Sequence, residues 1–462
     1  MGVTKRKLSE ILRDINSVAI VGASPKPGKV GNTVLQNILS YGFKGKIYPV
    51  NPKYRDILGL RTYPSLKDLP EVPDIAVVAV PTKAVPAVVA EASEIGVGLT
   101  VIITSGFKEA GNEEAERKLR ETMNSTQRMR VLGPNSAGIT ISTVKLHASI
   151  EAPPTPGRVG LAMQSGAMGG VVISRLKELS SGISFFMSLG NMADVEISDV
   201  FEYALEDDAT DSLIAYVEWV RDGKAFLEKG SRLAAVKPLC ILKGGRGERS
   251  SEAVRSHTGG LAGNYAVFKE AVRKIGAYLA DDVSDLVEVE EVLRRVGHLN
   301  GSRVLIVTNS GGLGVVTASH VEEHGLDLPP IPQKLAEGLT RQAGKSFTGK
   351  NPIDFGGDAS AEQVAKALTL SDLSKYFDVA LFVYVPTAAE GPEEMAKALR
   401  EHVDEFSLPV IAYFDGEGSR EVTMKVSSSL PAVTSARNAA RAISALVDRG
   451  KHLRLRVTHN SS

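Results

Sequence analysis

The chain of 462 residues is too long for one ordinary hydrophobic core, so its length predicts two to four domains. Hydrophobic residues make up 43% and charged residues 23%, with 54 basic and 54 acidic side chains. This balance is typical of globular proteins, and a net charge of zero excludes a strong field toward nucleic acid or an anionic membrane. The single cysteine excludes an internal disulfide and suits a reducing compartment. Without a signal peptide or an apolar run that could span a bilayer, we expect a cytoplasmic protein.

A short apolar strand, a glycine-rich turn and a helix recur three times along the chain. The first repeat runs from a strand at 17–22 into a helix at 31–39, and the second from a strand at 158–162 into a helix near Met168. The third repeat begins with a strand at 303–308. Alternating strands and helices predict parallel sheets that are covered on both faces. We therefore predict an α/β protein with three doubly wound domains in series.

Further strands and two linkers complete this organisation. The strands are predicted at 46–50, 75–80, 99–104, 129–132, 379–385 and 409–414. The proline-rich residues 152–157 suit neither a helix nor a central strand, so we place the first boundary there. The second boundary falls near 297–302. The predicted domains therefore span 1–150, 157–297 and 302–457.

The glycine-rich turn after the first strand predicts a diphosphate site. Glycine lets backbone N–H groups approach a phosphate, and the start of the following helix favours its charge. An NAD site would need an acid at the end of the second strand, but this strand leads into Asn51, Pro52 and Lys53. Lys53 and Lys29 suit the pyrophosphate and 3′-phosphate of CoA, although both could also be plain surface lysines.

The first domain resembles the CoA-binding domain of the succinyl-CoA synthetase superfamily, and most closely its ADP-forming acyl-CoA synthetase branch. The resemblance rests on residues 22–24, 31–32, 41–52 and 80–81. It implies that CoA is bound by Gly22, Ser24, Lys29, Asn51, Lys53, Val80, Pro81, Ser105 and Gly106. It also implies that Asn135, in the loop 133–138, donates a hydrogen bond to an acyl carbonyl; a plain Gly-Pro-Asn turn is the alternative.

The second domain contains a histidine between glycines. His257 lies beyond the apolar strand at 238–242, and the intervening glycines predict a loop with His257 at its far end, just before a helix. The N–H groups of Gly259 and Gly260 would then face a phosphoryl group on the imidazole, which is nucleophilic near pH 7. The basic residues Lys243, Arg246, Arg249 and Arg255 either hold phosphate or are solvated loop charges. The other seven histidines lack this setting and form no metal-ligand cluster with Cys240.

Residues 256–259 and 261–263 resemble the phosphohistidine loop of the same family. The resemblance implies that His257 carries phosphate and that Glu218, at the end of an apolar strand, orients its imidazole; a structural salt bridge is the alternative for Glu218. Residues 188–195 also match a family segment. The implied phosphate-binding residues are Gln164, Ser165, Gly166, Thr258, Gly259 and Gly260.

Residues 308–314 and 351–357 resemble the third α/β domain of the family, although a capping or Asx turn explains the second segment equally well. Neither an ATP-grasp domain nor a Walker A loop is present. The resemblance therefore implies an alpha subunit of an ADP-forming acyl-CoA (acetyl-CoA) synthetase, with a Rossmann-like CoA-binding domain followed by two flavodoxin-like domains. Its substrates would be CoA and phosphate, and Mg²⁺ and ADP or ATP would bind an ATP-grasp beta subunit in an α2β2 heterotetramer.

Two other classes of function stay open at this point. A CoA- or acyl-CoA-binding regulatory protein would need neither His257 nor Glu218. An NAD(P)-dependent oxidoreductase would need an acid after the second strand.

Overall fold

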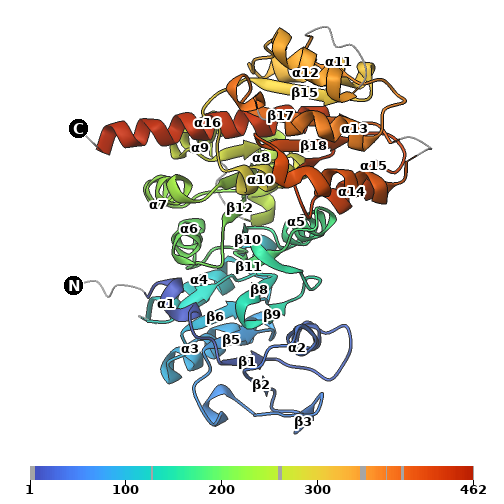
Figure 1. Ribbon diagram of the computed structural model, residues 1–462. Coiled ribbons are helices and arrows are strands. Elements are labelled where there is room, and N and C mark those ends of the chain that lie inside the picture. Colours follow the sequence, from blue (N-terminus) through green and yellow to red (C-terminus); the bar gives the residue numbers. More distant parts are fainter. Residues whose placement is uncertain are drawn as a thin grey trace. The chain divides into compact units, whose positions relative to one another are not determined.

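The computed structural model describes residues 6–125, 128–258, 263–343, 350–370, 372–386 and 390–460. Its strands form two five-stranded sheets, one seven-stranded sheet and a small two-stranded sheet. Helices flank each large sheet (Figure 1). The prediction of an α/β protein with three doubly wound domains is therefore confirmed. No helix in the described part of the chain is long and apolar enough to cross a membrane.

The first sheet is fully parallel and has the strand order β2-β1-β5-β6-β7. Its strands are β1 (Ser17–Val21), β2 (Lys46–Val50), β5 (Ile75–Val78), β6 (Leu99–Ile102) and β7 (Arg130–Leu132). The helices are α1 (Leu8–Leu12), α2 (Val30–Tyr41), α3 (Val85–Ile95) and α4 (Glu113–Ser125), and β3 (Asp56–Ile57) and β4 (Leu60–Arg61) form the small antiparallel sheet. The central strands β1, β5 and β6 are buried along their whole length, as expected for strands covered on both faces.

The second sheet has the order β14-β13-β12-β10-β11-β8-β9. Its parallel part comprises β10 (Pro156–Met163), β11 (Ile183–Ser188), β12 (Ser212–Val217), β13 (Leu239–Lys243) and β14 (Tyr278–Ala280). The helices are α5 (Gly166–Glu178), α6 (Ile197–Glu206), α7 (Gly223–Val236), α8 (Glu248–Thr258) and α9 (Tyr265–Ile275). The antiparallel strands β8 (Gly138–Ile141) and β9 (Leu146–Ser149) pair with β11, so they extend this sheet.

The third sheet is parallel and has the order β16-β15-β17-β18-β19. Its strands are β15 (Val304–Thr308), β16 (Ile353–Asp354), β17 (Val379–Tyr384), β18 (Val410–Phe414) and β19 (Ala432–Val433). The helices are α10 (Val283–Val296), α11 (Gly311–Glu323), α12 (Gln333–Ala343), α13 (Ala361–Lys366), α14 (Pro392–His402), α15 (Ser419–Val426) and α16 (Ala436–Asn460).

The parallel strands of all three large sheets share one topology, in which the first of them along the chain lies between the second and the third. In such sheets the connections that leave the first and the third strand run to opposite faces of the sheet. Ligands bind in the crevice between the carboxyl ends of these two strands. This rule places candidate sites at the exits of β1 and β5, of β10 and β12, and of β15 and β17.

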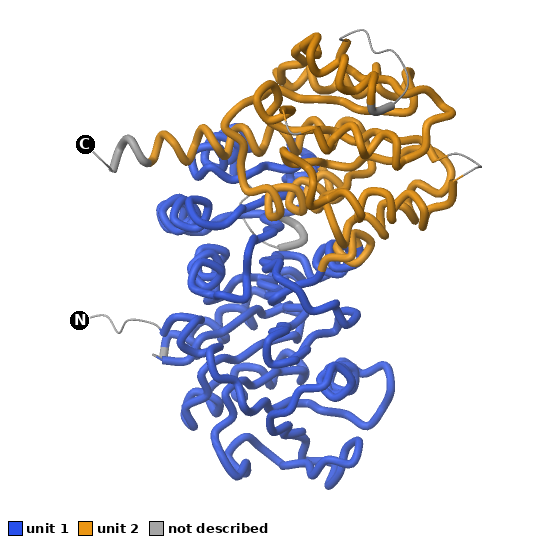
Figure 2. Tube along the Cα trace, in the orientation of Figure 1, with its two compact units in different colours: residues 1–174, 182–281 blue, residues 175–181, 282–462 orange. Residues whose placement is uncertain are grey.

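The chain divides into two compact units, which Figure 2 shows in different colours. Unit 1 comprises residues 1–174 and 182–281 and holds the first two large sheets, and unit 2 comprises 175–181 and 282–462. Residues 282–297 thus belong to unit 2, although our predicted second domain includes them, and the predicted boundaries 1–150, 157–297 and 302–457 remain predictions. Pro156 and Gly157, which we assigned to a linker, begin β10, because the first residue of a strand tolerates proline.

Candidate functional site

A cleft of about 860 Å³ opens at the carboxyl edge of the first sheet. It lies at the exits of β1 and β5, where the topology of the sheet places a ligand. The predicted CoA residues that line it are Gly22, Ser24, Lys29, Asn51, Lys53, Val80, Pro81 and Ser105. Gly106 and Asn135 are not among its lining residues. Sequence analysis missed Lys26, Tyr54 and Thr82, which also line the cleft and carry only ordinary surface-residue signals.

The backbone at Gly22 accepts no side chain. Its φ of +93° lies in the left-handed region, and an added Cβ would lie 2.4 Å from the carbonyl oxygen of Ala79. Asn51 holds the same turn from the other side, because its Nδ2 donates to the carbonyl of Ala23 at 2.8 Å and its Oδ1 accepts from the N–H of Lys53 at 3.0 Å. Asn51 therefore ties the exits of β1 and β2 together and orients the backbone that carries Lys53.

Asn135 and Gly106 belong to a hydrogen-bonded chain next to the cleft. Glu109 accepts from the N–H groups of Gly106 at 2.6 Å and Phe107 at 3.2 Å. Its other oxygen accepts from Nδ2 of Asn191 at 2.6 Å, and Oδ1 of Asn191 lies 3.4 Å from Nδ2 of Asn135. Asn135 itself has a φ of +58°, which is uncommon outside glycine and often marks functional sites. Sequence analysis missed Glu109.

Gln164 joins the exits of β10 and β12 at the switch point of the second sheet. Its Oε1 accepts from the N–H groups of Glu218 and Trp219, and its Nε2 donates to the carbonyl of Trp219 at 2.7 Å. A further contact of 2.9 Å joins Nε2 to the sulfur of Met192. These contacts occupy the side-chain amide of Gln164, so phosphate binding in this loop would depend on its neighbours.

Ser165 and Gly166 form the start of α5. The hydroxyl of Ser165 lies 3.4 Å from the N–H of Met168, and its carbonyl accepts from the N–H of Gly169. An added Cβ at Gly166 would lie 2.4 Å from Cβ of Ala137, so only glycine lets α5 begin this close to the loop 133–138. Both residues are half-buried at the positive end of a helix dipole, which is a suitable place for an anion.

Glu218 leaves β12 beside Tyr216 and Gly244. Glu218 is 5% exposed. Burial, and to a smaller extent the Glu218 carboxylate, raise the pKa of the neighbouring Tyr216 phenol to about 12. An added Cβ at Gly244 would lie 2.5 Å from the Tyr216 hydroxyl and 3.3 Å from Cγ of Glu218, so the three residues converge.

Of the nearby basic residues, Lys243 is buried and Arg246 is paired. Lys243 is 4% exposed, and its Nζ donates to the carbonyls of Glu218, at 2.7 Å, and Gly244. Burial lowers the pKa of Lys243 to about 8, while the charge of Glu218 opposes this shift. Arg246 donates to the carboxylate of Asp281 at 2.9 Å and to its carbonyl at 2.8 Å.

The segment that carries His257 differs from the predicted loop. Residues 248–258 form α8, so the backbone of His257 lies near the end of this helix, and the next helix begins only at Tyr265. Residues 248–256 contain no glycine or proline, so nothing in this stretch breaks a helix. The side chains of His257 and Thr258, together with Gly259 and Gly260, lie outside the described residues. Helix α8 lies beside Lys108–Ala110, the turn that follows Ser105 and Gly106.

Asp194, within the segment 188–195, has a structural role. Its Oδ2 accepts from Nε of Arg130 at 2.9 Å and from the N–H of Val131 at 2.9 Å. Arg130 also donates to Asp199 at 2.8 Å. The buried ion pair therefore fixes the loop after β11 to β7 of the first sheet.

In unit 2, the exit of β15 carries Asn309, whose Oδ1 accepts from the N–H of Val385 and whose Nδ2 donates to its carbonyl, both at 2.9 Å. Asp354 accepts from the N–H of Gly356 at 2.8 Å, which is the Asx turn considered as one interpretation of residues 351–357.

Comparison with known proteins assigns both halves of unit 1. The CoA binding domain family matches residues 16–142, and the succinyl-CoA ligase like flavodoxin domain family matches residues 156–293. Over 450 residues the chain is 34% identical to acetate–CoA ligase (ADP-forming) I subunit alpha from Pyrococcus furiosus, which covers 95% of this chain and 96% of that protein. A solved structure of the dinucleotide forming acetyl-coenzyme A synthetase 1 of Candidatus Korarchaeum cryptofilum, in complex with phosphate and ADP, has a TM-score of 0.90 and 32% identity, covering 97% of this chain and 99% of that chain.

Longer relatives extend beyond this chain. Acetate–CoA ligase (ADP-forming) I from Archaeoglobus fulgidus is 37% identical over 377 residues, which covers 80% of this chain and 54% of that protein. The chain therefore spans about half the length of that relative. A trans-feruloyl-CoA synthase from an unknown prokaryotic organism is 34% identical over 333 residues, covering 70% of this chain and 47% of that protein, so similar chains occur in proteins named for different acids.

Proposed function

Because this chain belongs to the family of alpha subunits of ADP-forming acetate–CoA ligases, within the NDP-forming acyl-CoA synthetase superfamily, we propose that it binds CoA and carries phosphate on His257. The reaction interconverts acyl-CoA, ADP and phosphate with a free acid, CoA and ATP. As its acid we propose acetate, the substrate in the names of the two alpha subunits that match 95% and 94% of the chain at 34% and 33% identity.

One observation carries this proposal. Helix α8, which holds the backbone of His257, lies against the turn Lys108–Ala110. That turn follows Ser105, which lines the cleft of the first sheet. The helix that carries the backbone of His257 therefore contacts the turn that follows a lining residue of the proposed CoA site, which supports a site shared by the thioester and the phosphate.

The first step forms an acyl phosphate. A phosphate oxygen attacks the thioester carbonyl carbon, the C–S bond breaks, and CoA leaves with the proton of hydrogen phosphate. In this step Lys29 and Lys53 hold the phosphates of CoA, the backbone at Gly22 admits its pyrophosphate, and Asn135 donates to the acyl carbonyl.

The second step transfers the phosphoryl group. A ring nitrogen of His257 attacks phosphorus, the bond to the acyl oxygen breaks, and the acid leaves as a carboxylate. Glu218 holds the proton on the other ring nitrogen, while Ser165, Gly166, Thr258, Gly259 and Gly260 provide donors to the phosphate. Gln164 supports this step by fixing the backbone of Glu218.

The third step needs a second protein. We propose that an ATP-grasp beta subunit holds ADP and Mg²⁺ and receives the phosphoryl group from His257 in an α2β2 heterotetramer. The word "alpha" in the names of the matching subunits supports a partner. A cytoplasmic location stays a prediction from composition.

The test is phosphorylation of the purified chain. Acetyl-CoA, Mg²⁺ and labelled phosphate should produce acid-labile label on the wild type and none on His257→Ala, and His320→Ala is the matched control because that histidine lies on α11 of unit 2. Binding of CoA without label, also with aryl and branched acyl-CoAs and a beta subunit present, would favour a CoA-binding regulatory protein instead. Preferential binding of NAD would favour an oxidoreductase.

A further inference from the structure

Lys243 contacts three elements at the carboxyl edge of the second sheet. Its Nζ donates to the carbonyl of Glu218, at the exit of β12, and to that of Gly244, the first residue of the segment leading to α8. It also lies 5.5 Å from the ring centroid of Phe268, on the first turn of α9. The segment between β13 and α9 carries His257, so Lys243 contacts both ends of that segment as well as Glu218.

We propose that Lys243 is a positioning residue of the phosphoryl-transfer site, which holds Glu218 and both ends of the His257 segment in place and supplies a buried positive charge. This inference rests on the function proposed above. A lysine with 4% exposure is rare unless it is paired, because its charge is costly to bury. At this position the charge lies beside the backbone of Glu218, the residue proposed to orient the imidazole of His257.

The state of Lys243 depends on a small set of neighbours. Burial lowers its pKa to about 8, the Glu218 carboxylate raises it, and the Arg246 guanidinium lowers it further. The Tyr216 phenol has a pKa raised to about 12, mainly by burial, so it stays neutral while Lys243 titrates. The neutral amine keeps two N–H donors for its two carbonyls. Deprotonation would therefore remove the charge while the hydrogen bonds persist, which separates the two roles experimentally.

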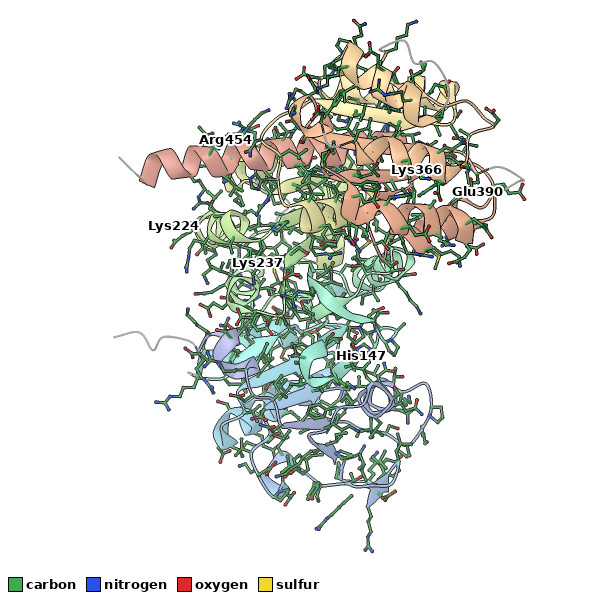
Figure 3. The ribbon with its side chains drawn as sticks, in the orientation of Figure 1. His147, Lys224, Lys237, Lys366, Glu390 and Arg454 are labelled. Atoms are coloured by element: carbon green, nitrogen blue, oxygen red, sulfur yellow. The ribbon has the colours of Figure 1, made fainter. Side chains whose placement is uncertain are left out.

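Lys237 provides a matched control at the other end of β13. Its Nζ also donates to two carbonyls, those of Ala204 and Asp207, both at 2.7 Å, and burial lowers its pKa as well. It precedes the start of β13, whereas Lys243 is the last residue of that strand. The two lysines are thus about 20 Å apart along the strand, and Lys237, labelled in Figure 3, contacts α6 through the carbonyl of Ala204.

The experiment measures single-turnover formation of acid-labile phosphate from acetyl-CoA and labelled phosphate at pH values from about 6.5 to 9.5. In the wild type we expect the rate to fall as pH rises through about 8. Lys243→Met should lose at least about tenfold at neutral pH and show no decline at alkaline pH. Lys243→Arg keeps the charge at every pH tested, so it should regain much of the rate without the alkaline decline. Lys237→Met should lower only the thermal unfolding temperature.

The outcomes separate this inference from the proposed function. A wild type that forms no label overturns both. A labelled wild type overturns the inference alone if folded Lys243→Met keeps the wild-type rate and pH profile, or if it loses no more than Lys237→Met. If Lys243→Met does not fold, Lys243→Arg provides the test. A labelling rate that declines in Lys243→Arg at the same alkaline pH as in the wild type would also overturn the inference.

Discussion

Gln164 and Asn309 occupy the same place in two different sheets. Each is the first residue after the first parallel strand of its sheet, and each uses a side-chain amide to pair with the backbone at the exit of the third parallel strand. Gln164 pairs with Glu218 and Trp219, and Asn309 pairs with Val385. The amide is therefore a structural device of the topology, which closes the switch point of the sheet where its connections diverge.

The equivalence also separates the two sites chemically. The residue that follows β12 is Glu218, whereas the residue that follows β17 is Val385. A carboxylate at this position can orient an imidazole, but an aliphatic side chain cannot. The switch point of the second sheet is accordingly the one that suits the proposed phosphoryl transfer.

Loss of the Gln164 amide should damage both the site and the stability of unit 1. Gln164→Ala leaves the N–H groups of Glu218 and Trp219 without their partner, at a cost of about 1–3 kcal/mol for each buried group. We expect at least about tenfold slower labelling of the chain by phosphate. Trp219 is the only tryptophan, so its fluorescence reports the change directly.

Asn309→Ala is the control for this prediction. It should destabilise unit 2, seen as faster hydrogen exchange in β15 and β17, and leave the labelling rate of unit 1 near that of the wild type. Equal loss of labelling in the two variants would show that the switch points of the second and third sheets do not differ in this role.

Gly22 should be indispensable for CoA binding. In Gly22→Ala the new Cβ would lie 2.4 Å from the carbonyl of Ala79, so the turn at the cleft must shift. We expect the affinity for CoA, measured by calorimetry, to fall at least about tenfold. Gly96→Ala is matched in backbone conformation, with a φ of +94° but open space around it. It should cost about 1 kcal/mol of stability and leave CoA affinity unchanged.

Many of the strands were predictable because their apolar runs end in glycine, proline or polar turns. The strand at 46–50 agrees residue by residue with β2, and the predicted strands at 75–80 and 99–104 extend only two residues beyond β5 and β6. Lys53 and Ser105, which the family resemblance assigned to one CoA site, both follow carboxyl strand ends and line one cleft. Their binding of CoA stays a prediction.

Contacts between distant residues were not predictable in the same way. Nothing in the local sequence indicates that Glu109 would meet Asn191, or that Lys243 would be buried against Glu218, because such pairs arise from tertiary packing alone. The hairpin of β8 and β9 was missed because every residue of its two strands is buried, so the alternation that marks a half-exposed strand is absent. Helix α8 was missed because the flanking glycines suggested a loop.

Lys53 should recognise the 3′-phosphate of CoA. It is exposed at the mouth of the cleft, where a charged amine contributes mainly through electrostatic attraction. We expect Lys53→Ala to weaken CoA binding about tenfold but to leave the affinity for 3′-dephospho-CoA nearly unchanged, and the effect should shrink at high salt. Lys46→Ala is the control, since Lys46 pairs with Glu71 at the start of β2. An equal loss of affinity for CoA and 3′-dephospho-CoA in Lys53→Ala would show that Lys53 contacts another part of CoA.

The Arg130–Asp194 pair should contribute strongly to the stability of unit 1. Both side chains are at most 6% exposed, so Asp194→Asn leaves a buried guanidinium with only Asp199 as its carboxylate partner. We expect a loss of about 3 kcal/mol in the free energy of unfolding, followed by Trp219 fluorescence. Asp211→Asn breaks the exposed pair with Arg158 and should cost less than about 1 kcal/mol. Similar losses in the two variants would show that burial does not set the contribution of the pair.

His147, labelled in Figure 3, should make the stability of unit 1 fall at acidic pH. Its Nδ1 contacts the hydroxyl of Thr140 at 2.7 Å and its Nε2 lies 3.0 Å from the carbonyl of Glu151, an arrangement that suits the neutral ring with the proton on Nε2. Burial lowers the pKa of His147, an effect that the hydrogen bond to Glu151 partly offsets.

The direction of the pH effect follows from that shift. In the unfolded chain the imidazole has a pKa of about 6.5, so below this pH the unfolded state binds the proton more readily than the folded state. The stabilising contribution is therefore complete above about pH 6.5 and declines as pH falls toward the lower pKa of the folded state. His147→Gln keeps a donor but does not titrate, so its free energy of unfolding, followed by Trp219 fluorescence, should change less between about pH 7 and 5 than that of the wild type. The exposed His298→Gln, in unit 2, should follow the wild-type curve, and a wild-type slope in His147→Gln would assign the acid sensitivity to other groups.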